Sequence, residues 1–263
     1  MKIIAFSSIC IDYFPEKKLS VPGGNSLNFA VQTRRLGEKD VAIAGFIGTD
    51  PASKQILKLC VDEGINARYI NQIEGATASN KLYITAEGER YSKPGEWQNG
   101  VKDDGLFTNE VWNFILDQDV IALPCNDRHL DDLLKERTEN NFISVDFMHF
   151  DSADFISRYL PLLDIAFVSP EHRSLNSLKT LSCSLNKPVV AMLGAEGSIA
   201  FYDGKEYKQN ALKTEKVVDT TGCGDAYQAA FCYAINHNST VNEAMQLATV
   251  TATKVLTGYG GVW

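Results

Sequence analysis

The sequence predicts an α/β fold in which a mostly parallel central sheet carries helices on both faces. Short apolar runs of strand length alternate with longer amphipathic runs over most of the chain. Such alternation is typical of parallel strands joined by helices. The chain has 263 residues, of which 44% are hydrophobic. This suits one domain with a large buried core, so residues 1–263 are expected to form a single domain.

The first 65 residues alternate strand and helix twice. The expected strands are residues 2–9 and 41–48, and the expected helices are residues 25–36 and 51–63. Asp50 is placed to cap the second helix, Pro51 suits its first turn, and Gly64 suits its end. This order of elements favours a parallel or mostly parallel sheet.

Residues 67–100 interrupt the alternation. The stretch is polar, rich in β-forming residues and punctuated by Gly88 and Gly95, and AEGER (residues 86–90) is typical of a hairpin turn. We expect this stretch, together with residues 13–21, to form a small β-lid separate from the main core.

The alternation resumes after residue 100. The expected strands are residues 119–123, 142–146, 164–168 and 188–193, and the expected helices are residues 108–117, 127–138, 152–160 and 171–185. A hairpin that turns at Asp203-Gly204 follows. Two long helices, residues 223–237 and 240–256, complete the pattern.

Composition argues against several classes of function. The net charge is −8 and no basic stripe opposes it, which disfavours binding to nucleic acid. The six cysteines form no CxxC pair and no zinc-ligand spacing, so they indicate reduced thiols. No segment resembles a signal peptide or reaches the roughly 20 apolar residues of a membrane span. We expect a soluble, cytoplasmic protein with no nucleic-acid or membrane partner.

The stretch VVDTTGCGDAYQAAF (residues 217–231) places two glycines and a carboxylate where a helix begins. Backbone N–H groups at a helix N-terminus carry partial positive charge, and glycine lets an anion approach them. Gly222, Cys223 and Gly224 are therefore a candidate phosphate-binding nest. Asp225 would repel a phosphate unless it faced a hydroxyl about to attack the phosphorus, which makes it a candidate general base. The alternative is an ordinary helix cap.

A second glycine pair, Gly23 and Gly24, precedes the first expected helix. Exposed backbone there can approach a polyol, and Asn25 or Asn28 can hydrogen-bond its hydroxyls. Asp12, expected at the end of the first strand, suits two vicinal hydroxyls, because ligands of open α/β sheets bind beyond the carboxyl ends of the strands. The chain contains no Walker A loop, no GxGxxG fingerprint and no protein-kinase catalytic loop.

Three longer motifs occur in order along the chain: PGGNSLNFAVQTRRLG…FIGTD, LGAEGSIAFYDG and DTTGCGDAYQAAF. They resemble the N-terminal signature, the nucleotide-site strand and hairpin, and the C-terminal signature of the PfkB/ribokinase family of carbohydrate kinases. The resemblance covers essentially the whole chain. It implies a ribokinase-like three-layer sandwich with a β-lid that closes over the sugar and often forms a homodimer interface. It also implies ATP and Mg²⁺.

The resemblance implies roles for individual residues. Asp225 matches the family's catalytic base, and Gly222, Cys223 and Gly224 match the anion hole around the transferring phosphoryl group. The other implied residues are Asp12, Gly23, Gly24 and Asn28 for the sugar, Gly194, Gly197, Gly222 and Gly224 for the nucleotide, and Asp219 and Thr221 for a monovalent cation such as K⁺. Asp146 and His149, near a strand end that lies by the sugar in the family, are further candidates for substrate contact.

Two departures from the family pattern concern the phosphates. In FVSPEHRS the usual N-x-x-E becomes Ser169 and His172, so Glu171 is the expected substitute for helping to hold Mg²⁺ and the phosphates. Cys223 stands where alanine is usual, and a small neutral side chain leaves a backbone nest intact. The first departure keeps a non-catalytic sugar sensor open as an alternative. The presence of Asp225 within a full nest argues against it.

Two stretches, CIDYFPEKKLSVPGGNSLN and GYGGVW, are most similar to family members that phosphorylate the 6-hydroxyl of fructoselysine and related Amadori compounds. In the lid, Arg90 is a candidate partner for the acceptor's carboxylate, and Trp97 or Tyr91 for stacking. Glu89 or Glu96 could meet its ammonium group. Fructose, ribose, a keto-deoxy sugar acid or a nucleoside are the alternative acceptors.

Overall fold

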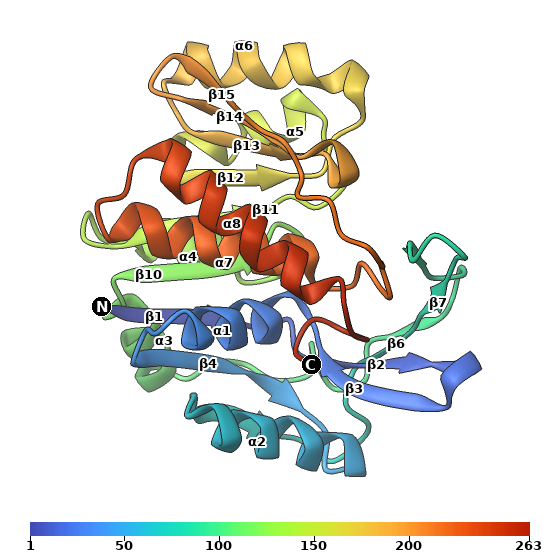
Figure 1. The fold of residues 1–263 in the computed structure, drawn as a ribbon. Coiled ribbons are helices and arrows are strands. Elements are labelled where there is room, and N and C mark those ends of the chain that lie inside the picture. Colours follow the sequence, from blue (N-terminus) through green and yellow to red (C-terminus); the bar gives the residue numbers. More distant parts are fainter.

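The computed structural model describes all 263 residues, and a nine-stranded sheet lies at its centre (Figure 1). Its strands are β1 (Lys2–Phe6), β4 (Asp40–Ile47), β5 (Asn66–Gln72), β10 (Val120–Pro124), β11 (Phe142–Asp146), β12 (Ile165–Val168), β13 (Val189–Met192), β14 (Ser198–Tyr202) and β15 (Lys205–Gln209). Their order is β15-β14-β13-β12-β11-β10-β1-β4-β5. All neighbours from β13 to β5 pair in parallel, and only β14 and β15 are antiparallel. The mostly parallel sheet is confirmed.

Helices cover both faces of this sheet. One face carries α1 (Asn25–Arg35), α2 (Pro51–Glu63), α7 (Cys223–Asn236) and α8 (Val241–Val255), and the other carries α3 (Asn109–Leu116), α4 (Leu130–Glu136), α5 (Ala153–Ser157) and α6 (Leu175–Leu185). Successive residues of one strand serve different faces. Ile3 and Ala5 of β1 pack in the core with α7 and α8, whereas Ile4 and Phe6 pack with α3 and α4. The three-layer α/β sandwich is confirmed.

A second, smaller sheet projects from one end of the sandwich (Figure 1). It contains β3 (Leu19–Gly23), β2 (Cys10–Phe14), β6 (Ser79–Lys81) and β9 (Trp97–Gln98) in that order, and β7 (Tyr83–Ile84) and β8 (Arg90–Tyr91) form a separate hairpin beside it. We call this sheet and its hairpin the lid. The lid thus unites two stretches of the chain that are far apart in sequence.

The lid differs from the expectation in two places. β5 falls inside the range expected for the lid, but it pairs with β4 at the edge of the central sheet. Only Ile70 of β5 is buried, so this edge strand is as polar as a lid strand and the sequence does not distinguish them. At the other end, β1 stops at Phe6 rather than continuing to residue 9. Ser7, with φ 80°, then turns the chain out of the sheet.

The helix boundaries follow local capping chemistry. The Asp50 side chain accepts the N–H of Ser53 at the start of α2, and Gly64 ends that helix with φ 68°. Asp203 and Gly204 both have positive φ at the β14–β15 turn, as expected for a two-residue hairpin. α4 and α5 are shorter than the expected 127–138 and 152–160. No helix combines the length and the hydropathy that crossing a lipid bilayer requires.

Candidate active site

The predicted nest forms at the start of α7. Gly222 precedes the helix in a left-handed conformation with φ 79°, and α7 begins at Cys223. A Cβ at Gly222 would lie 2.4 Å from Cα of Gly261, so this turn requires glycine. The N–H of Cys223 donates to the carbonyl of Thr220 at 3.3 Å, whereas the next N–H groups lie in the first helical turn, where no intrahelical acceptor exists. The turn is therefore suited to bind an anion.

Asp225 lies in the same turn and is held by two amides. Its Oδ1 accepts Nδ2 of Asn25 at 2.7 Å and its Oδ2 accepts Nδ2 of Asn28 at 2.8 Å. The two asparagines are one turn apart on α1, which packs against α7. Burial raises the pKa of Asp225, although the amides and the charge of Arg90 oppose that rise. A carboxylate with a raised pKa and a fixed orientation is suited to accept a proton.

Asn28 also presents an unused acceptor. Its side chain is 2% exposed, and its Oδ1 has no hydrogen-bond partner in the protein. A buried carbonyl without a partner is unfavourable. A donor from a bound molecule, such as a hydroxyl, would satisfy it.

Asp12 does not lie at the end of β1, as the sequence suggested, but on β2 in the lid sheet. Its side chain is 4% exposed. Burial, together with the charges of Asp219 and Asp225, raises the pKa of Asp12 to about 7, and Arg90 opposes this rise. A Cβ at Gly23 would lie 2.1 Å from Oδ2 of Asp12. Gly23 therefore makes room for this carboxylate.

Gly24 has a different requirement. It precedes α1 with φ 99°, and a Cβ there would lie 2.5 Å from the carbonyl oxygen of Ser8. The two neighbouring glycines thus let the lid strand β3 turn directly into α1. This turn brings Asn25 and Asn28 against Asp225.

Asp146 is a third buried carboxylate at this end of the sheet. It ends β11, and its Oδ1 accepts the N–H of Met148 at 2.8 Å. Its Oδ2 accepts the same Asn25 amide that binds Asp225, at 3.3 Å. Burial and the charge of Asp225 raise the pKa of Asp146 to about 7. Asn25 thus lies between two carboxylates, whereas the sequence suggested that Asn25 or Asn28 would hydrogen-bond hydroxyls of a polyol.

Arg90 faces this acidic cluster from the lid. Its positive charge lowers the pKa of Asp12, Asp146 and Asp225, although no carboxylate oxygen lies within 4.0 Å of it. The guanidinium therefore compensates several buried acids without pairing with one of them. Such a cation is available to an acidic group of a ligand.

The other lid candidates differ in their availability. Glu96 is paired with Lys81 at 2.8 Å and accepts the hydroxyl of Tyr83. The ring of Tyr91 stacks on Tyr83, and its side chain remains 43% exposed. Trp97 is 44% exposed. Two aromatic faces of the lid are therefore open, whereas Glu96 is already paired.

The expected phosphate residues line a separate cavity of about 430 Å³ at the ends of β11, β12 and β13. Its lining residues are His149, Asp151, Ser169, Pro170, Glu171, His172, Met192 and Leu193. The Nε2 of His172 lies 2.7 Å from Oε1 of Glu196, which ties the loop after β12 to the loop after β13. Glu171 pairs with Arg173 at 2.8 Å. Ser169 and Glu171 thus line the same cavity.

The two glycines expected beside the nucleotide have different surroundings. Gly194 has φ 59°, and a Cβ there would meet nothing within 4 Å, so its backbone is open to a ligand. A Cβ at Gly197 would lie 2.0 Å from the carbonyl oxygen of Gln209. Gly197 therefore serves the close packing of β14 on β15.

Asp219 is fully buried beside the nest. Its Oδ1 accepts the N–H and the hydroxyl of Thr221 at 2.8 and 2.7 Å, and its Oδ2 accepts the N–H of Gly260 at 2.7 Å. No basic side chain pairs with it. A buried carboxylate that has hydrogen bonds but no cationic partner fits a nearby monovalent cation.

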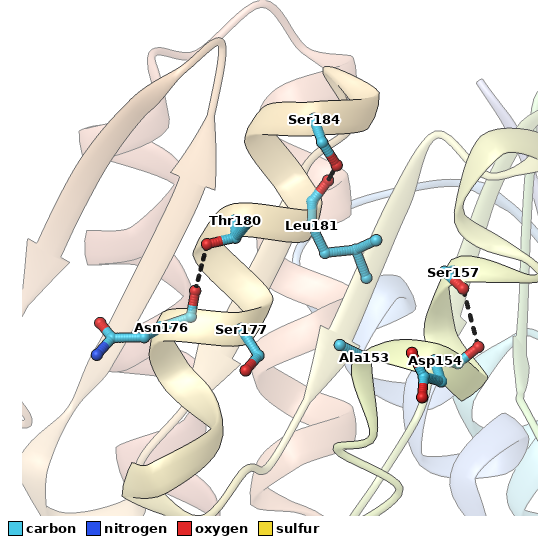
Figure 2. Close-up of a pocket in the computed structure, with 8 residues that line it drawn as sticks. All are labelled: Ala153, Asp154, Ser157, Asn176, Ser177, Thr180, Leu181 and Ser184. Atoms are coloured by element: carbon cyan, nitrogen blue, oxygen red, sulfur yellow. Dashed lines mark hydrogen bonds between the residues drawn. The ribbon is translucent and has the colours of Figure 1, made fainter.

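A second groove, of about 420 Å³, runs between α5 and α6 (Figure 2). Three of its four hydroxyls are used within their own helices: Thr180 donates to the carbonyl of Asn176, Ser184 to that of Leu181, and Ser157 to that of Asp154. It shares no residue with the acidic cluster. We therefore place the functional site at the nest.

A family model for pfkB family carbohydrate kinases matches residues 16–262. The chain belongs to this family. It is accordingly a kinase that transfers a phosphoryl group to an alcohol, and the nest, Asp225 and all of the lid except β2 lie within the matched residues.

Curated relatives are similar over nearly the whole chain. The fructosamine kinase FrlD of Bacillus subtilis is 28% identical over 267 residues, covering 99% of this chain and 92% of that protein. The fructoselysine 6-kinase of Escherichia coli is 24% identical, covering 97% and 96%. A ribokinase of Lactococcus lactis is also 24% identical, covering 91% and 80%.

Solved structures show the same fold. The ribokinase of Arabidopsis thaliana complexed with ribose and ATP superposes with a TM-score of 0.82 at 19% identity, covering 99% of this chain and 94% of that one. The ribokinase of Thermotoga maritima gives 0.78 at 20% identity, covering 100% and 95%. The ribokinase-like fold is confirmed.

Proposed function

We propose that this kinase transfers the γ-phosphate of ATP to the 6-hydroxyl of fructoselysine or a related Amadori compound. The observation that carries the proposal is Asp225, fixed by Asn25 and Asn28 at the edge of the nest. The similarity to FrlD and to fructoselysine 6-kinases supports the acceptor.

The charges around the site also support this acceptor. An Amadori compound carries an ammonium group on C1 and a carboxylate on its amino acid. Asp12 and Asp146 are buried acids with raised pKa values that an ammonium group would favour in their ionised form. Arg90 is a cation available to the carboxylate. A neutral sugar would use only part of this arrangement.

The proposed reaction is an in-line displacement. The acceptor lies between the lid and the start of α1, where Asp12 and the free Oδ1 of Asn28 accept hydrogen bonds from its hydroxyl groups. The 6-hydroxyl oxygen forms a bond to the γ-phosphorus, the bond from that phosphorus to ADP breaks, and Asp225 receives the proton. The N–H groups of the nest stabilise charge on the transferring group. Closure of the lid excludes water.

The nucleotide is proposed to extend from the nest toward the cavity that Ser169 and Glu171 line. The carboxylate of Asp151 in that cavity already accepts hydrogen bonds from the N–H of Glu171 and the hydroxyl of Ser174. Glu171, whose exposed carboxylate pairs only with Arg173, is therefore the carboxylate of this cavity that fits Mg²⁺ carried by the phosphates. Mg²⁺ would neutralise phosphate charge there. We also propose that K⁺ binds beside Asp219 and Thr221.

The test is ADP release with ATP, Mg²⁺ and K⁺ against a panel of acceptors: fructoselysine, other Amadori compounds, fructose, ribose, a keto-deoxy gluconate and adenosine. The Asp225→Asn variant provides the blank. We expect the highest kcat/KM with an Amadori compound. A higher value with ribose, fructose or adenosine would reassign the acceptor. Binding of sugars without ADP release would support the sensor alternative.

A further inference from the structure

The tip of the lid hairpin lies against the segment that leads into the nest. We call residues 85–90 the hairpin tip and residues 217–221 the pre-nest segment. The N–H of Thr220 donates to the carbonyl of Gly88 at 3.2 Å, and the N–H of Arg90 donates to Oγ1 of Thr220 at 3.1 Å. The Thr220 hydroxyl in turn donates to Oε2 of Glu89 at 3.3 Å. One side chain, Thr220, thus makes two of the three bonds.

The hairpin tip and the pre-nest segment also fit each other sterically. Gly88 is buried, and a Cβ there would lie 2.5 Å from Cγ1 of Val217. The hairpin tip has its own internal support: the N–H of Thr85 donates to the carbonyl of Glu89 at 2.9 Å, and that of Gly88 to the carbonyl of Thr85 at 3.0 Å. The hairpin tip is therefore a preformed turn that docks as a unit.

The pre-nest segment is fixed on its other side. The N–H of Val218 donates to the carbonyl of Leu256 at 2.8 Å, and Asp219 accepts the N–H of Gly260. The carbonyl of Thr220 accepts the N–H of Cys223, the first residue of α7. The hairpin tip thus binds the same few residues that shape the nest.

This contact determines where Arg90 lies. The backbone of Arg90 is bonded to Thr220, and its side-chain charge acts on Asp12, Asp146 and Asp225. We propose that Thr220 is a positioning residue that latches the hairpin tip to the pre-nest segment, so that Arg90 is held over the acceptor site. The proposal rests on the kinase activity and not on the identity of the acceptor.

The first experiment measures docking without any substrate. Trypsin cleaves after arginine, and we expect the docking of the Arg90 backbone on Thr220 to protect the bond between Arg90 and Tyr91. We expect Thr220→Val, which keeps the shape but removes the hydroxyl, to speed cleavage at this bond about tenfold, the effect of losing two hydrogen bonds of ordinary strength. Thr220→Ser should restore most of the protection. Glu87→Ala is the matched control, because Glu87 lies on the same tip and its side chain makes no bond to Thr220.

The second experiment separates positioning from a general structural role. With the best acceptor of the panel, Thr220→Val should raise the acceptor KM about fivefold and change kcat less, because a bound acceptor still draws the lid closed. Thr220→Ser should return KM toward the wild-type value, whereas a structural defect would affect kcat and KM in both variants.

A third variant tests the pairing itself. Glu89→Ala removes an exposed side chain, so it should fold even if Thr220→Val does not. If the Thr220 hydroxyl and Glu89 act together, the variant that combines Thr220→Val with Glu89→Ala should be cleaved little faster than either single variant. Wild-type cleavage rates in Thr220→Val and Glu89→Ala, or equal losses in Thr220→Val and Thr220→Ser, would overturn the proposal.

Discussion

Two amides fix the orientation of Asp225, and this makes its role testable. If Asp225→Asn is made, the new amide can be accommodated, because Asn28 has a free Oδ1 and can rotate its own amide to accept from it. The variant should therefore fold and still bind the acceptor, because a hydroxyl can accept a hydrogen bond from Nδ2 of the rotated Asn28 in place of donating one to its Oδ1.

Turnover should respond differently. Without a carboxylate to receive the proton, we expect kcat of Asp225→Asn to fall by about 10²- to 10⁴-fold. Steady-state turnover and acceptor binding by calorimetry measure the two effects. Wild-type kcat in this variant would remove Asp225 from the role of base.

Asp146 offers a prediction about stability and pH. Its pKa rises from an ordinary 3.8 to about 7 on folding, so the protonated form is favoured in the native state. Its contribution to stability is complete below about pH 4 and is lost as the pH rises through 7. Asp146→Asn removes the buried charge, so we expect it to be more stable than the wild type at pH 8, by about 4 kcal/mol, and similar at pH 4.

Thermal unfolding of the ligand-free proteins at both pH values measures this difference. Asp151→Asn is the control of opposite sign, because hydrogen bonds from Ser174 and Glu171 lower the pKa of Asp151. A constant difference between Asp146→Asn and the wild type at both pH values would contradict the pKa shift.

At the scale of elements, the turn into α7 depends on a residue without a Cβ. Gly222 combines a φ of 79° with a Cβ position 2.4 Å from Gly261. Gly204, in the β14–β15 turn, has φ 69° but open space around its Cβ position. Both glycines thus have a positive φ that strains any other residue, but only at Gly222 would an added Cβ also clash with a neighbour.

We expect Gly204→Ala to cost about 1 kcal/mol of unfolding free energy and to leave turnover unchanged. Gly222→Ala should cost about 3 kcal/mol, because packing is added to strain, and should lower kcat about 100-fold by displacing nest N–H groups. Denaturant unfolding and turnover measure both variants. Equal effects of the two substitutions would show that Gly222 serves only backbone conformation.

The lid shows how an element can be assembled from distant parts. β2 and β3 come from the start of the chain and β6 and β9 from beyond residue 78, yet they form one sheet. Asp12 belongs to this sheet, so a movement of the lid would carry with it a carboxylate that we propose binds the substrate. The direct connection from β3 to α1 joins the lid to one side of the site, and the Thr220 contact joins it to the pre-nest segment on the other.

At the scale of the whole molecule, the segment Gly258–Trp263 completes the site. A Cβ at Gly261 would lie 2.5 Å from Cγ of Asn28, and its carbonyl accepts Nε2 of Gln32 at 2.8 Å. Arg35 donates to the carbonyls of Val262 and Trp263. This segment therefore packs along α1, and Gly261 lies directly against the side chain of Asn28.

We expect Gly261→Ala to push Asn28 away from Asp225 and to lower kcat at least tenfold. Gly95→Ala is the control, because Gly95 has open space around its Cβ position in the lid. Turnover and thermal unfolding of both variants measure the effect. Wild-type turnover in Gly261→Ala would show that Asn28 is not needed in its present position.

The sequence by itself determined the features that have a local cause. Alternating apolar runs determined the mostly parallel sheet, capping residues determined the start and end of α2, and two glycines before an acid determined the nest. These patterns depend on residues a few positions apart, so their physical basis can be recognised without a fold.

Only the tertiary structure decided how distant parts meet. Asn28 reaches Asp225 across 197 residues, and Arg90 bonds to Thr220 across 130. Asp12 lies in the lid rather than in the central sheet, because the chain turns out of that sheet at Ser7. β5 lies in the central sheet rather than in the lid, because a polar edge strand has the same local pattern as a lid strand. The roles of Gly23 and Gly197 were decided by a carboxylate and a carbonyl from other strands. Contacts of this kind arise from packing and leave no local signature in the chain.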